Sequence, residues 1–475
     1  MTGSQEAPDE EFDVAVVGAG VVGCAIARAF AQRGMSVALL DSRSDVGDVT
    51  SKANTAILHT GYDAKPGTLE SRLVARGYQL LGDYAAKAGI PVEPLGALLV
   101  AWDVEQAETL PELAEQAVAN GYEHTRQVDA EEVRRREPHL GDGQFGALEV
   151  PGESIICPWT TTLAFATEAV RHGARLLLGH TVLGVEPAEE HVVLDTDRGK
   201  VRARHVVNAA GLGSDEVHRM FGHKSFSVTP RRGQLIVFDK LARSLLNHIL
   251  LPVPSKFGKG VLVSPTVYGN VMLGPTAENM DDRTATESTE DGMAMLRDKG
   301  RRILPALLDE EVTTVYAGLR AATEHSDYQI SFHPKQRYVC VGGIRSTGLT
   351  SSLAIAEHLT EQMAAWPGLD LSGPPLEAAP PRMPSIGQAQ ARPHQDAGLI
   401  AQDPAYGEIV CFCERVSRGE IRDALHSDIP PADIGGLRRR TRAGMGRCQG
   451  FFCGSAVSRM IRDGADAPIA AEIIK

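Results

Sequence analysis

Near the start of the chain, hydrophobic residues form a continuous run, then a helically spaced segment, and then a second continuous run. Residues 14–17 are apolar and mostly β-branched, which is typical of a strand covered on both faces. A glycine-rich turn and an apolar helical segment follow, and a second apolar run over 36–40 ends in Asp41. The pattern therefore predicts a β–α–β unit over residues 12–41, which is the first unit of an α/β fold.

The same periodicities predict the elements that follow. Helical spacing of apolar residues predicts helices over 69–88, 104–121, 129–137, 158–172, 290–304 and 349–365. Short apolar or alternating runs predict strands over 95–101, 182–186, 191–196, 200–204 and 338–343, and a strand from 205 that runs into small residues. Residues 229–332 have a mostly β-like pattern. These elements indicate a Rossmann-like α/β domain with a mixed-sheet α+β domain inserted into it.

The turn after the first strand has the spacing G-x-G-x-x-G, formed by Gly18, Gly20 and Gly23. The first glycine permits a tight turn, the second lets a pyrophosphate approach the backbone, and the third lets helix and strand pack closely. Asp41 lies about 20 residues past the glycines, where a carboxylate suits a ribose hydroxyl. The unit predicts a dinucleotide site. The alternatives are a glycine-rich turn in another α/β unit and, within dinucleotides, NAD or FAD.

Three later stretches are rich in small or polar residues. Residues 50–62 have the composition of a loop that wraps a ligand, and residues 208–214 and 342–348 combine a strand end with glycines. A backbone without bulky side chains can pass close to a bound molecule. The last stretch also precedes a predicted helix, whose N-terminus offers N–H groups to the same ligand.

Composition limits the classes of function. The chain has 475 residues, enough for two or three domains, and 43% of them are hydrophobic, as in soluble globular proteins. The formal net charge of −13 argues against nucleic acid as a partner. No apolar run approaches the roughly 20 residues of a membrane helix, and the acidic N-terminus is unlike a targeting segment. We therefore expect a cytoplasmic protein with no transmembrane segment, while peripheral membrane contact stays open.

The seven cysteines are unevenly distributed. Cys24, Cys157 and Cys340 stand alone in apolar contexts that predict buried thiols. The others form a C-x-C pair and a C-x₄-C pair in the tail, after a proline-rich segment over 367–406: Cys411, Cys413, Cys448 and Cys453. Four thiolates can hold a [2Fe–2S] cluster or a tetrahedral zinc ion, and their spacing does not separate these two or an empty remnant.

Taken together, these motifs resemble the D-amino acid oxidase superfamily of flavoproteins, which favours FAD over NAD. The resemblance implies a discontinuous FAD-binding domain (12–90, 151–215 and 335–366), a substrate domain (91–150 and 216–334), the linker 367–406 and a small helical cysteine-rich domain (407–475). It assigns FAD contacts to Gly18, Gly20, Gly23, Asp41, Ser42, Ser51, Thr55, Val182, Ala210, Gly211, Gly343, Gly348, Leu349 and Thr350.

Two groups within that superfamily are most similar. The loop 51–61 with 65–69 resembles the L-2-hydroxyglutarate dehydrogenases, and the overall architecture resembles the anaerobic-type glycerol-3-phosphate dehydrogenase large subunit. The residues around the tail cysteines resemble the bacterioferritin-associated-ferredoxin-like [2Fe–2S] domain, which favours the cluster over zinc. One departure is that Tyr62-Asp63-Ala64 follows Gly61, where the glycerol-3-phosphate enzymes usually continue with an Arg-Tyr pair.

Three residues are the main catalytic candidates. His59 has a side chain suited to take the proton from a secondary alcohol, or alternatively it only hydrogen-bonds the flavin or backbone. Arg320 and Arg345 have planar guanidinium groups that bind carboxylate or phosphate with two hydrogen bonds, and a surface salt bridge is the alternative for Arg320. Lys256 and Tyr268 are weaker candidates. The histidines form no H-x-x-x-H pair, so we expect no histidine-based metal site.

These inferences predict an FAD-dependent dehydrogenase for a small anionic hydroxy substrate. Glycerol 3-phosphate, oxidised to dihydroxyacetone phosphate, is the first expectation, and an L-2-hydroxy acid such as L-2-hydroxyglutarate is the second. Electrons would leave the flavin, through the [2Fe–2S] cluster, for a redox partner subunit or another acceptor. An amino acid or amine oxidase, and a non-catalytic electron-transfer subunit, are the remaining alternatives.

Overall fold

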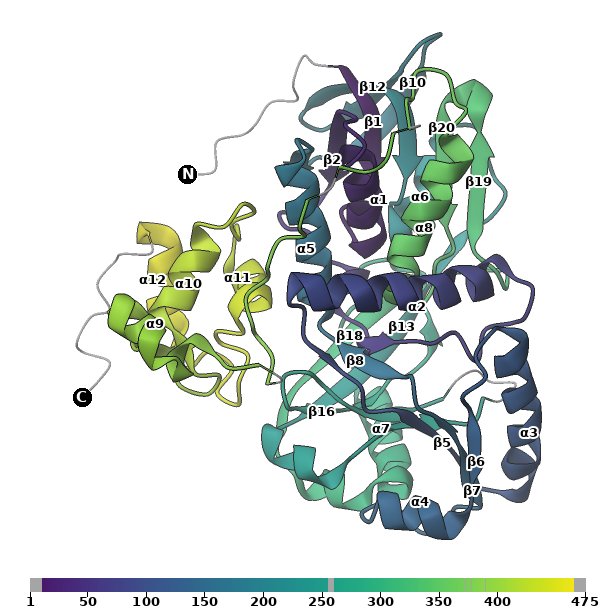
Figure 1. Cartoon of the computed structure of the whole chain (residues 1–475), viewed down its shortest axis with the longest axis vertical. Coiled ribbons are helices and arrows are strands. Elements are labelled where there is room, and N and C mark those ends of the chain that lie inside the picture. The colour runs from purple at the N-terminus through teal and green to yellow at the C-terminus, as the bar shows by residue number, and fades with distance from the viewer. Residues whose placement is uncertain (1–10, 255–259, 372, 377, 389, 465–475) are drawn as a thin grey trace.

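The computed structural model describes residues 11–254, 260–371, 373–376, 378–388 and 390–464. Two large sheets lie one above the other in Figure 1, and a smaller helical unit, in yellow-green, lies beside them. The α/β class with a second mixed sheet and a helical C-terminal segment is confirmed.

The first sheet contains the predicted β–α–β unit. Its strands run in the order β10-β11-β12-β1-β2-β9, and β20 and β19 extend it from β12. Strands β12, β1, β2 and β9 are parallel neighbours, and β20 is parallel to β12. The strands are β1 (Glu11–Val17), β2 (Val37–Asp41), β9 (Arg175–Leu178), β10 (Val182–Pro187), β11 (Val192–Thr196), β12 (Gly199–Asn208), β19 (Gln329–His333) and β20 (Tyr338–Gly342).

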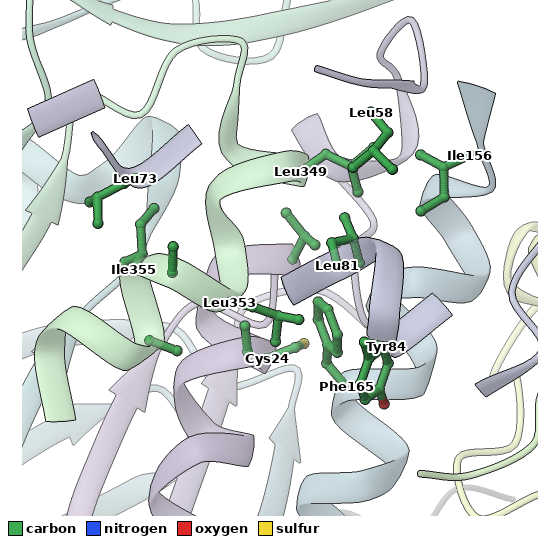
Figure 2. Packing of buried hydrophobic residues seen from close by; sticks show 14 of the residues in the cluster. Cys24, Leu58, Leu73, Leu81, Tyr84, Ile156, Phe165, Leu349, Leu353 and Ile355 are labelled. Atoms are coloured by element: carbon green, nitrogen blue, oxygen red, sulfur yellow. The ribbon is translucent and has the colours of Figure 1, made fainter. Parts of the chain in front are cut away.

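Helices cover this sheet and form the largest core of the protein. Helix α1 (Val21–Ala31) packs against α5 (Pro158–Arg171) and α8 (Gly348–Met363), and α6 (Ser214–Met220) contacts β20. Figure 2 shows Cys24, Phe165 and Leu353 meeting where these helices converge, all of them buried. Burial of such side chains contributes roughly 1.5–3 kcal/mol each, so this core holds the glycine turn at the start of α1 in place.

The second sheet has the order β17-β13-β16-β15-β14-β5-β7-β6, with β18 paired to β13. It draws strands from two separate parts of the chain: β5 (Ala97–Ala101), β6 (Arg126–Val128) and β7 (Gly146–Val150), and then β13 (Val228–Phe238), β14 (Ile249–Pro252), β15 (Leu262–Pro265), β16 (Val271–Gly274), β17 (Glu278–Asn279) and β18 (Val312–Thr323). Helices α3 (Val104–Ala119), α4 (Ala130–Arg136) and α7 (Glu290–Ile303) belong to this half. Strand β19, although it falls within 216–334, pairs with β20 in the first sheet.

Helix α2 (Leu69–Ala88) crosses the molecule between the two sheets (Figure 1). The Thr68 hydroxyl accepts a hydrogen bond from the Ser71 N–H and so caps its N-terminus. A Cβ atom at Gly77 would lie 2.3 Å from the Thr350 carbonyl oxygen, so glycine allows α2 to pass directly over α8. Below α2 lies the small sheet of β3 (Ile57–Leu58), β4 (Val92–Glu93) and β8 (Ser154–Ile156), which carries the loop with His59.

The tail forms a compact unit with its own apolar core. It contains α9 (Ala397–Gln402), α10 (Arg418–Leu425), α11 (Ile434–Thr441), α12 (Gly454–Asp463) and the hairpin of β21 (Ile409–Cys411) and β22 (Val416–Ser417). The proline-rich segment before it is not extended throughout, since α9 falls inside it and Met383 and Ile386 are buried in the main core. Among the described residues, no helix has both the length and the apolar character needed to cross a bilayer.

Candidate functional site

A cavity of about 1180 Å³ opens along the glycine turn and continues between the two sheets. Its walls come from the first β–α–β unit, the loop after β2, the end of β12, the face of β13 and β18, and the start of α8. The volume exceeds the roughly 300–1,000 Å³ of an ordinary ligand pocket. The cavity is therefore large enough for a dinucleotide together with a small substrate.

The glycine turn has the geometry that its spacing predicts. Gly18 has a positive φ of 107°, and a Cβ atom there would lie 2.4 Å from the Ala209 carbonyl oxygen. A Cβ atom at Gly23 would lie 1.8 Å from the Gly18 carbonyl oxygen. Any side chain at either position would push helix and strand apart. Gly20 lines the cavity at the N-terminus of α1, where free N–H groups attract a phosphate.

Polar side chains surround that helix N-terminus. The Ser51 hydroxyl accepts a hydrogen bond of 2.9 Å from the Val21 N–H. The Asp41 carboxylate accepts hydrogen bonds from the Ala19 and Arg43 N–H groups, at 2.7 and 2.8 Å. Burial raises the pKa of Asp41 despite these bonds. Each carboxylate oxygen has a second lone pair, so Asp41 remains able to accept from a ribose hydroxyl in the cavity.

Most of the residues assigned to FAD by resemblance line this cavity. They are Gly18, Gly20, Asp41, Ser42, Ser51, Thr55, Val182, Ala210, Gly211, Gly348 and Leu349. Gly23, Gly343 and Thr350 are not part of the lining. Gly23 serves the contact between helix and strand, Gly343 has a positive φ of 65° in the turn after β20, and the Thr350 hydroxyl accepts from the His59 N–H at 3.0 Å. These glycine cradles, which a Cβ atom would fill, fit an extended dinucleotide.

His59 lies on the cavity wall and is held from behind by Glu153. Its Nδ1 lies 2.8 Å from Glu153 Oε2, and the other carboxylate oxygen accepts from the N–H and hydroxyl of Thr60 at 2.6 and 2.9 Å. The Glu153 side chain is fully buried, whereas that of His59 is 18% exposed. A carboxylate only accepts hydrogen bonds, so Nδ1 carries the hydrogen and the lone pair is at Nε2. The sequence analysis missed Glu153, which lies 94 residues away.

Arg320 and Arg231 face the cavity from paired strands. They are directly opposite in the register of β18 and β13, and both line the cavity. Burial, with the charge of Arg231, lowers the pKa of Arg320 to about 10. Within the described part of the chain neither guanidinium has a carboxylate partner, and Arg231 Nε is buried without any hydrogen bond. Two adjacent cations without a counterion form a site for an anion.

Arg345 also lines the cavity, but it is committed to neighbouring groups. Its guanidinium donates to the Glu70 carboxylate and, at 2.6 Å, to the Ser326 carbonyl oxygen. Glu70 also accepts from the Thr347 hydroxyl at 2.7 Å, just before α8. Arg345 therefore braces the turn at the start of α8 and has less freedom than Arg320 to bind a substrate.

The two weaker candidates lie elsewhere. Tyr268 does not line the cavity; it is buried, hydrogen-bonded to the Cys157 thiol at 3.0 Å and stacked on Trp159 with ring centroids 4.8 Å apart. Lys256 lies outside the described residues. Cys24, Cys157 and Cys340 are buried free thiols, as their apolar contexts predict.

The four tail cysteines group in two pairs. Cys411 interacts with Cys453, and Cys413 with Cys448. The neighbouring Cys453 thiol lowers the pKa of Cys411, and the Gly444 N–H donates to the Cys411 sulfur at 3.4 Å. Two pairs of thiolates match a two-iron cluster, in which each iron takes two cysteines.

Glycine gives this site its shape as well. A Cβ atom at Gly446 would lie 2.3 Å from the Cβ atom of Cys413, so no larger residue fits between the two cysteine loops. Glu414, next to Cys413, is buried and accepts from Arg442 Nε at 2.8 Å and from Lys240 Nζ at 3.0 Å. Arg442 in turn lies 4.2 Å above the Tyr268 ring. The residues present therefore fit a cluster held against the main body.

A second contact fixes the tail to the first β–α–β unit. Arg440 donates to both oxygens of the buried Asp45 carboxylate at 2.8 Å, and Arg439 donates to Asp45 at 2.6 Å. Asp45 belongs to the loop after β2, and other residues of this loop line the cavity. The arginine run of the tail, which alone could be a solvated face, thus anchors the cysteine unit beside the cavity.

Comparison with protein families gives two matches. A family model described as FAD dependent oxidoreductase matches residues 13–362. A second, described as BFD-like [2Fe-2S] binding domain, matches residues 409–463. Together they cover both the cavity and the four tail cysteines.

Comparison with individual proteins gives similar chains over most of the length. A glycerol 3-phosphate dehydrogenase of Caloramator mitchellensis is 36% identical, over 95% of this chain and 94% of that protein. The structure of L-alpha-glycerophosphate oxidase from Mycoplasma pneumoniae with FAD bound aligns with a TM-score of 0.71 and 26% identity, over 81% and 99% of the two chains. The human mitochondrial L-2-hydroxyglutarate dehydrogenase is 30% identical over 58% of this chain and 63% of that protein.

Proposed function

Because the chain belongs to the family of FAD-dependent oxidoreductases and carries a BFD-like [2Fe–2S] binding domain, we propose that it oxidises glycerol 3-phosphate to dihydroxyacetone phosphate. The observation that carries this proposal is the pair Arg231 and Arg320, two half-buried guanidinium groups that face the cavity without a carboxylate partner. A phosphate dianion is the ligand that two such forks bind best. The similarity to a glycerol 3-phosphate dehydrogenase over 95% of the chain supports the same substrate.

In this proposal the arginines of the cavity bind the substrate and His59 removes its proton. Arg320 and Arg231 hold the phosphate, which places the substrate carbinol on the side of the cavity that His59 lines. Nε2 of His59 takes the hydroxyl proton, and Glu153 keeps Nδ1 protonated and stabilises the positive charge that develops on the ring. FAD held by the glycine turns would supply the acceptor for the hydride of the carbinol carbon.

The flavin site is formed by the glycine turns. Gly18 and Gly20, with the N-terminus of α1 and Ser51, would hold the pyrophosphate, and Asp41 would accept from the ribose. Gly211, Gly348 and Leu349 contribute the opposite wall. Val74 of α2 and Leu349 of α8 also line the cavity, where their apolar side chains would help to keep water from the reacting groups.

We propose that electrons leave through the tail to an acidic electron-transfer protein. A [2Fe–2S] cluster on the four cysteines supplies a one-electron carrier. Along the sequence, Phe412 lies between Cys411 and Cys413, and Phe451 and Phe452 lie between Cys448 and Cys453. The three phenylalanines are 66%, 84% and 63% exposed, respectively. Arg415, which follows Phe412 in the first cysteine loop, is also exposed, whereas Arg447 is paired with Asp239 and Glu311. Exposed aromatic groups beside an arginine form a surface suited to an acidic partner.

An L-2-hydroxy acid is the second candidate substrate. An arginine fork also binds carboxylate, and the partial similarity to an L-2-hydroxyglutarate dehydrogenase favours this alternative. The intact His59–Glu153 pair argues against a purely electron-transferring subunit, since such a subunit needs no buried base.

Anaerobic titration of the purified FAD-loaded protein tests the proposal. We expect glycerol 3-phosphate to bleach the flavin absorbance and to be converted to dihydroxyacetone phosphate, with each product molecule accounting for two electrons taken up by the flavin and the cluster together. L-2-hydroxyglutarate added to a parallel sample should leave the flavin oxidised. Bleaching by L-2-hydroxyglutarate alone would select the second candidate, and bleaching by neither would refute both.

A further inference from the structure

Three histidines that are far apart in sequence meet at one point on the first half of the molecule. His218 lies on α6, His223 in the turn after it, and His333 at the end of β19. One ring nitrogen from each lies within 4.8 Å of those of the other two. The ring centroids of His223 and His333 are 3.9 Å apart, and those of His218 and His223 are 4.8 Å apart. The sequence analysis expects no histidine-based metal site because the chain has no H-x-x-x-H pair. That criterion detects histidines that are close in sequence and does not detect three that meet only in the folded structure.

Neighbouring groups hold these rings by their other nitrogens. The Gln336 side-chain N–H donates to the Phe221 carbonyl oxygen at 3.1 Å, which turns its Oε1 toward His223 Nε2, 2.6 Å away. Nε2 of His223 is therefore the protonated nitrogen, and Nδ1 carries the lone pair. His333 Nε2 lies 3.0 Å from the Ser331 hydroxyl. Among the described residues no partner is present for Nδ1 of either ring.

His218 is the buried member of the cluster. The Tyr338 hydroxyl accepts from the Asn208 amide at 3.0 Å and lies 3.1 Å from His218 Nδ1, while the Ser225 hydroxyl lies 3.0 Å from Nε2. Burial, with the two neighbouring imidazoles, lowers the pKa of His218 to about 4. Burial also lowers the pKa of His333.

We propose that His218, His223 and His333 form a binding site for a divalent transition metal of the zinc class. Three imidazole nitrogens suit Zn²⁺ and its neighbours, whereas Mg²⁺ and Ca²⁺ prefer oxygen ligands. Hydrogen-bonded outer nitrogens are the usual support of histidine ligands. Zn–N bonds of about 2.1 Å require the three donor atoms to come closer than 4.8 Å. Binding would therefore reorient the partly buried rings of His223 and His333, whose centroids are 3.9 Å apart, and would replace the contact between His218 Nε2 and the Ser225 hydroxyl.

The site stands apart from the flavin cavity, since none of the three histidines lines it. A bound ion would join α6, the turn after it and the β19–β20 hairpin, which otherwise meet through side-chain contacts alone. The fourth position would be taken by water, because only His218 of the three is fully buried. Its role is structural stabilisation, independent of the proposed oxidation.

Titration of the cluster-loaded holoprotein with Co²⁺ tests the proposal. We expect one tightly bound equivalent with visible ligand-field bands and no sulfur-to-cobalt charge-transfer band, which separates this site from the tail cysteines. His223→Ala and His333→Ala should each weaken binding by more than about 100-fold, because losing only a hydrogen-bond partner of a ligand costs about 10–100-fold. The exposed His124, in the segment just before β6, supplies the matched control His124→Ala.

A second readout is thermal unfolding with and without Zn²⁺. Binding to the folded state raises the melting midpoint of the wild type and of the control, and should not raise that of the two variants. Absence of the histidine-type cobalt spectrum in the wild type, or the same affinity in wild type and both variants, would overturn the proposal. The outcome is independent of whether glycerol 3-phosphate is the substrate.

Discussion

Nδ1 of His59 lies 2.8 Å from Oε2 of Glu153, a carboxylate that is completely buried behind the cavity wall. A buried carboxylate in this position fixes the orientation and the tautomer of the imidazole. Because Glu153 also accepts two hydrogen bonds from Thr60, this side chain fixes the start of the loop after β3, while the Asn120 amide holds the carbonyl groups further along it.

We expect Glu153→Gln to lower kcat by about 10–100-fold with KM nearly unchanged, because the base is misoriented and its charge is no longer balanced. His59→Asn should lower kcat further, by about 100–10,000-fold. The measurement is steady-state turnover of FAD-loaded protein, with flavin content as a check on folding. Glu216→Gln, a change at an exposed carboxylate on the same cavity, is the control and should stay within about twofold. A loss of kcat in Glu216→Gln as large as that in Glu153→Gln would contradict the role given to Glu153.

We expect Arg320→Met to raise KM for glycerol 3-phosphate by about 10–150-fold, as loss of a charge-assisted hydrogen bond of about 1.5–3 kcal/mol implies. Glycerol, which lacks the phosphate, should be affected much less. Lys299→Met removes an exposed cation from the same cavity and should change KM less than about twofold. If Arg320→Met raises KM equally for glycerol 3-phosphate and for glycerol, Arg320 does not bind the phosphate.

The pH dependence of the wild type follows from the same residue. Burial lowers the pKa of Arg320 to about 10, so its positive charge is complete well below pH 10 and is lost as the pH rises through that value. We expect KM to rise above pH 10 and this rise to be absent from Arg320→Met. Initial rates between pH 8 and about 10.5 measure it, and a KM of the wild type that stays flat to the upper limit would refute it.

Local features of the fold were predictable from sequence because they depend on neighbours in the chain. The glycine turn at Gly18–Gly23, the cap at Thr68 and the paired tail cysteines all have signals within a few residues. Asp129 caps the helix that follows it in the same way, because its carboxylate accepts a hydrogen bond from the Glu132 N–H. The family models confirm the FAD-binding and [2Fe–2S]-binding assignments.

The contacts that complete the site were not predictable, because they depend on tertiary register. Arg231 becomes the partner of Arg320 only when β13 and β18 pair with residue 233 opposite residue 318. Glu153 reaches His59 only because β8 pairs with β3, and the three histidines meet only where α6 packs on β20. Periodicity fixes which face a residue occupies but not which distant residue lies opposite.

Gly446→Ala should prevent cluster assembly. The added Cβ atom would lie 2.3 Å from the Cβ atom of Cys413 and would force the two cysteine loops apart. We expect the rhombic EPR signal of the reduced protein to be lost, as in a Cys413→Ser variant, while the flavin absorbance is retained. Gly454→Ala, at a glycine with open space around it, is the matched control and should keep the signal. A full EPR signal from Gly446→Ala would show that the loops adapt, contrary to this prediction.

Asp45→Asn should release the cysteine unit from the main body. Asp45 and Arg440 form a buried two-bond ion pair, and removing one partner of such a pair costs about 3–5 kcal/mol. Hydrogen exchange of residues 409–463 should therefore speed up while that of the first sheet stays unchanged. Asp428→Asn breaks the pair with Arg171, which also joins the tail to α5 but is exposed on both sides, and should have almost no effect.

Acidification should act on the same contact. Burial by itself would raise the pKa of Asp45, but the hydrogen bonds and charges of Arg440 and Arg439 hold it below its usual value. The stabilisation is therefore complete above the unfolded-state pKa of about 3.9 and is lost as the pH falls through the lower, folded-state value. We expect the wild type to show faster exchange in 409–463 only below about pH 4, and Asp45→Asn to show it at neutral pH. Slow exchange in Asp45→Asn at neutral pH would mean that the ion pair between Lys240 of the main body and Glu414 of the tail suffices to hold the tail.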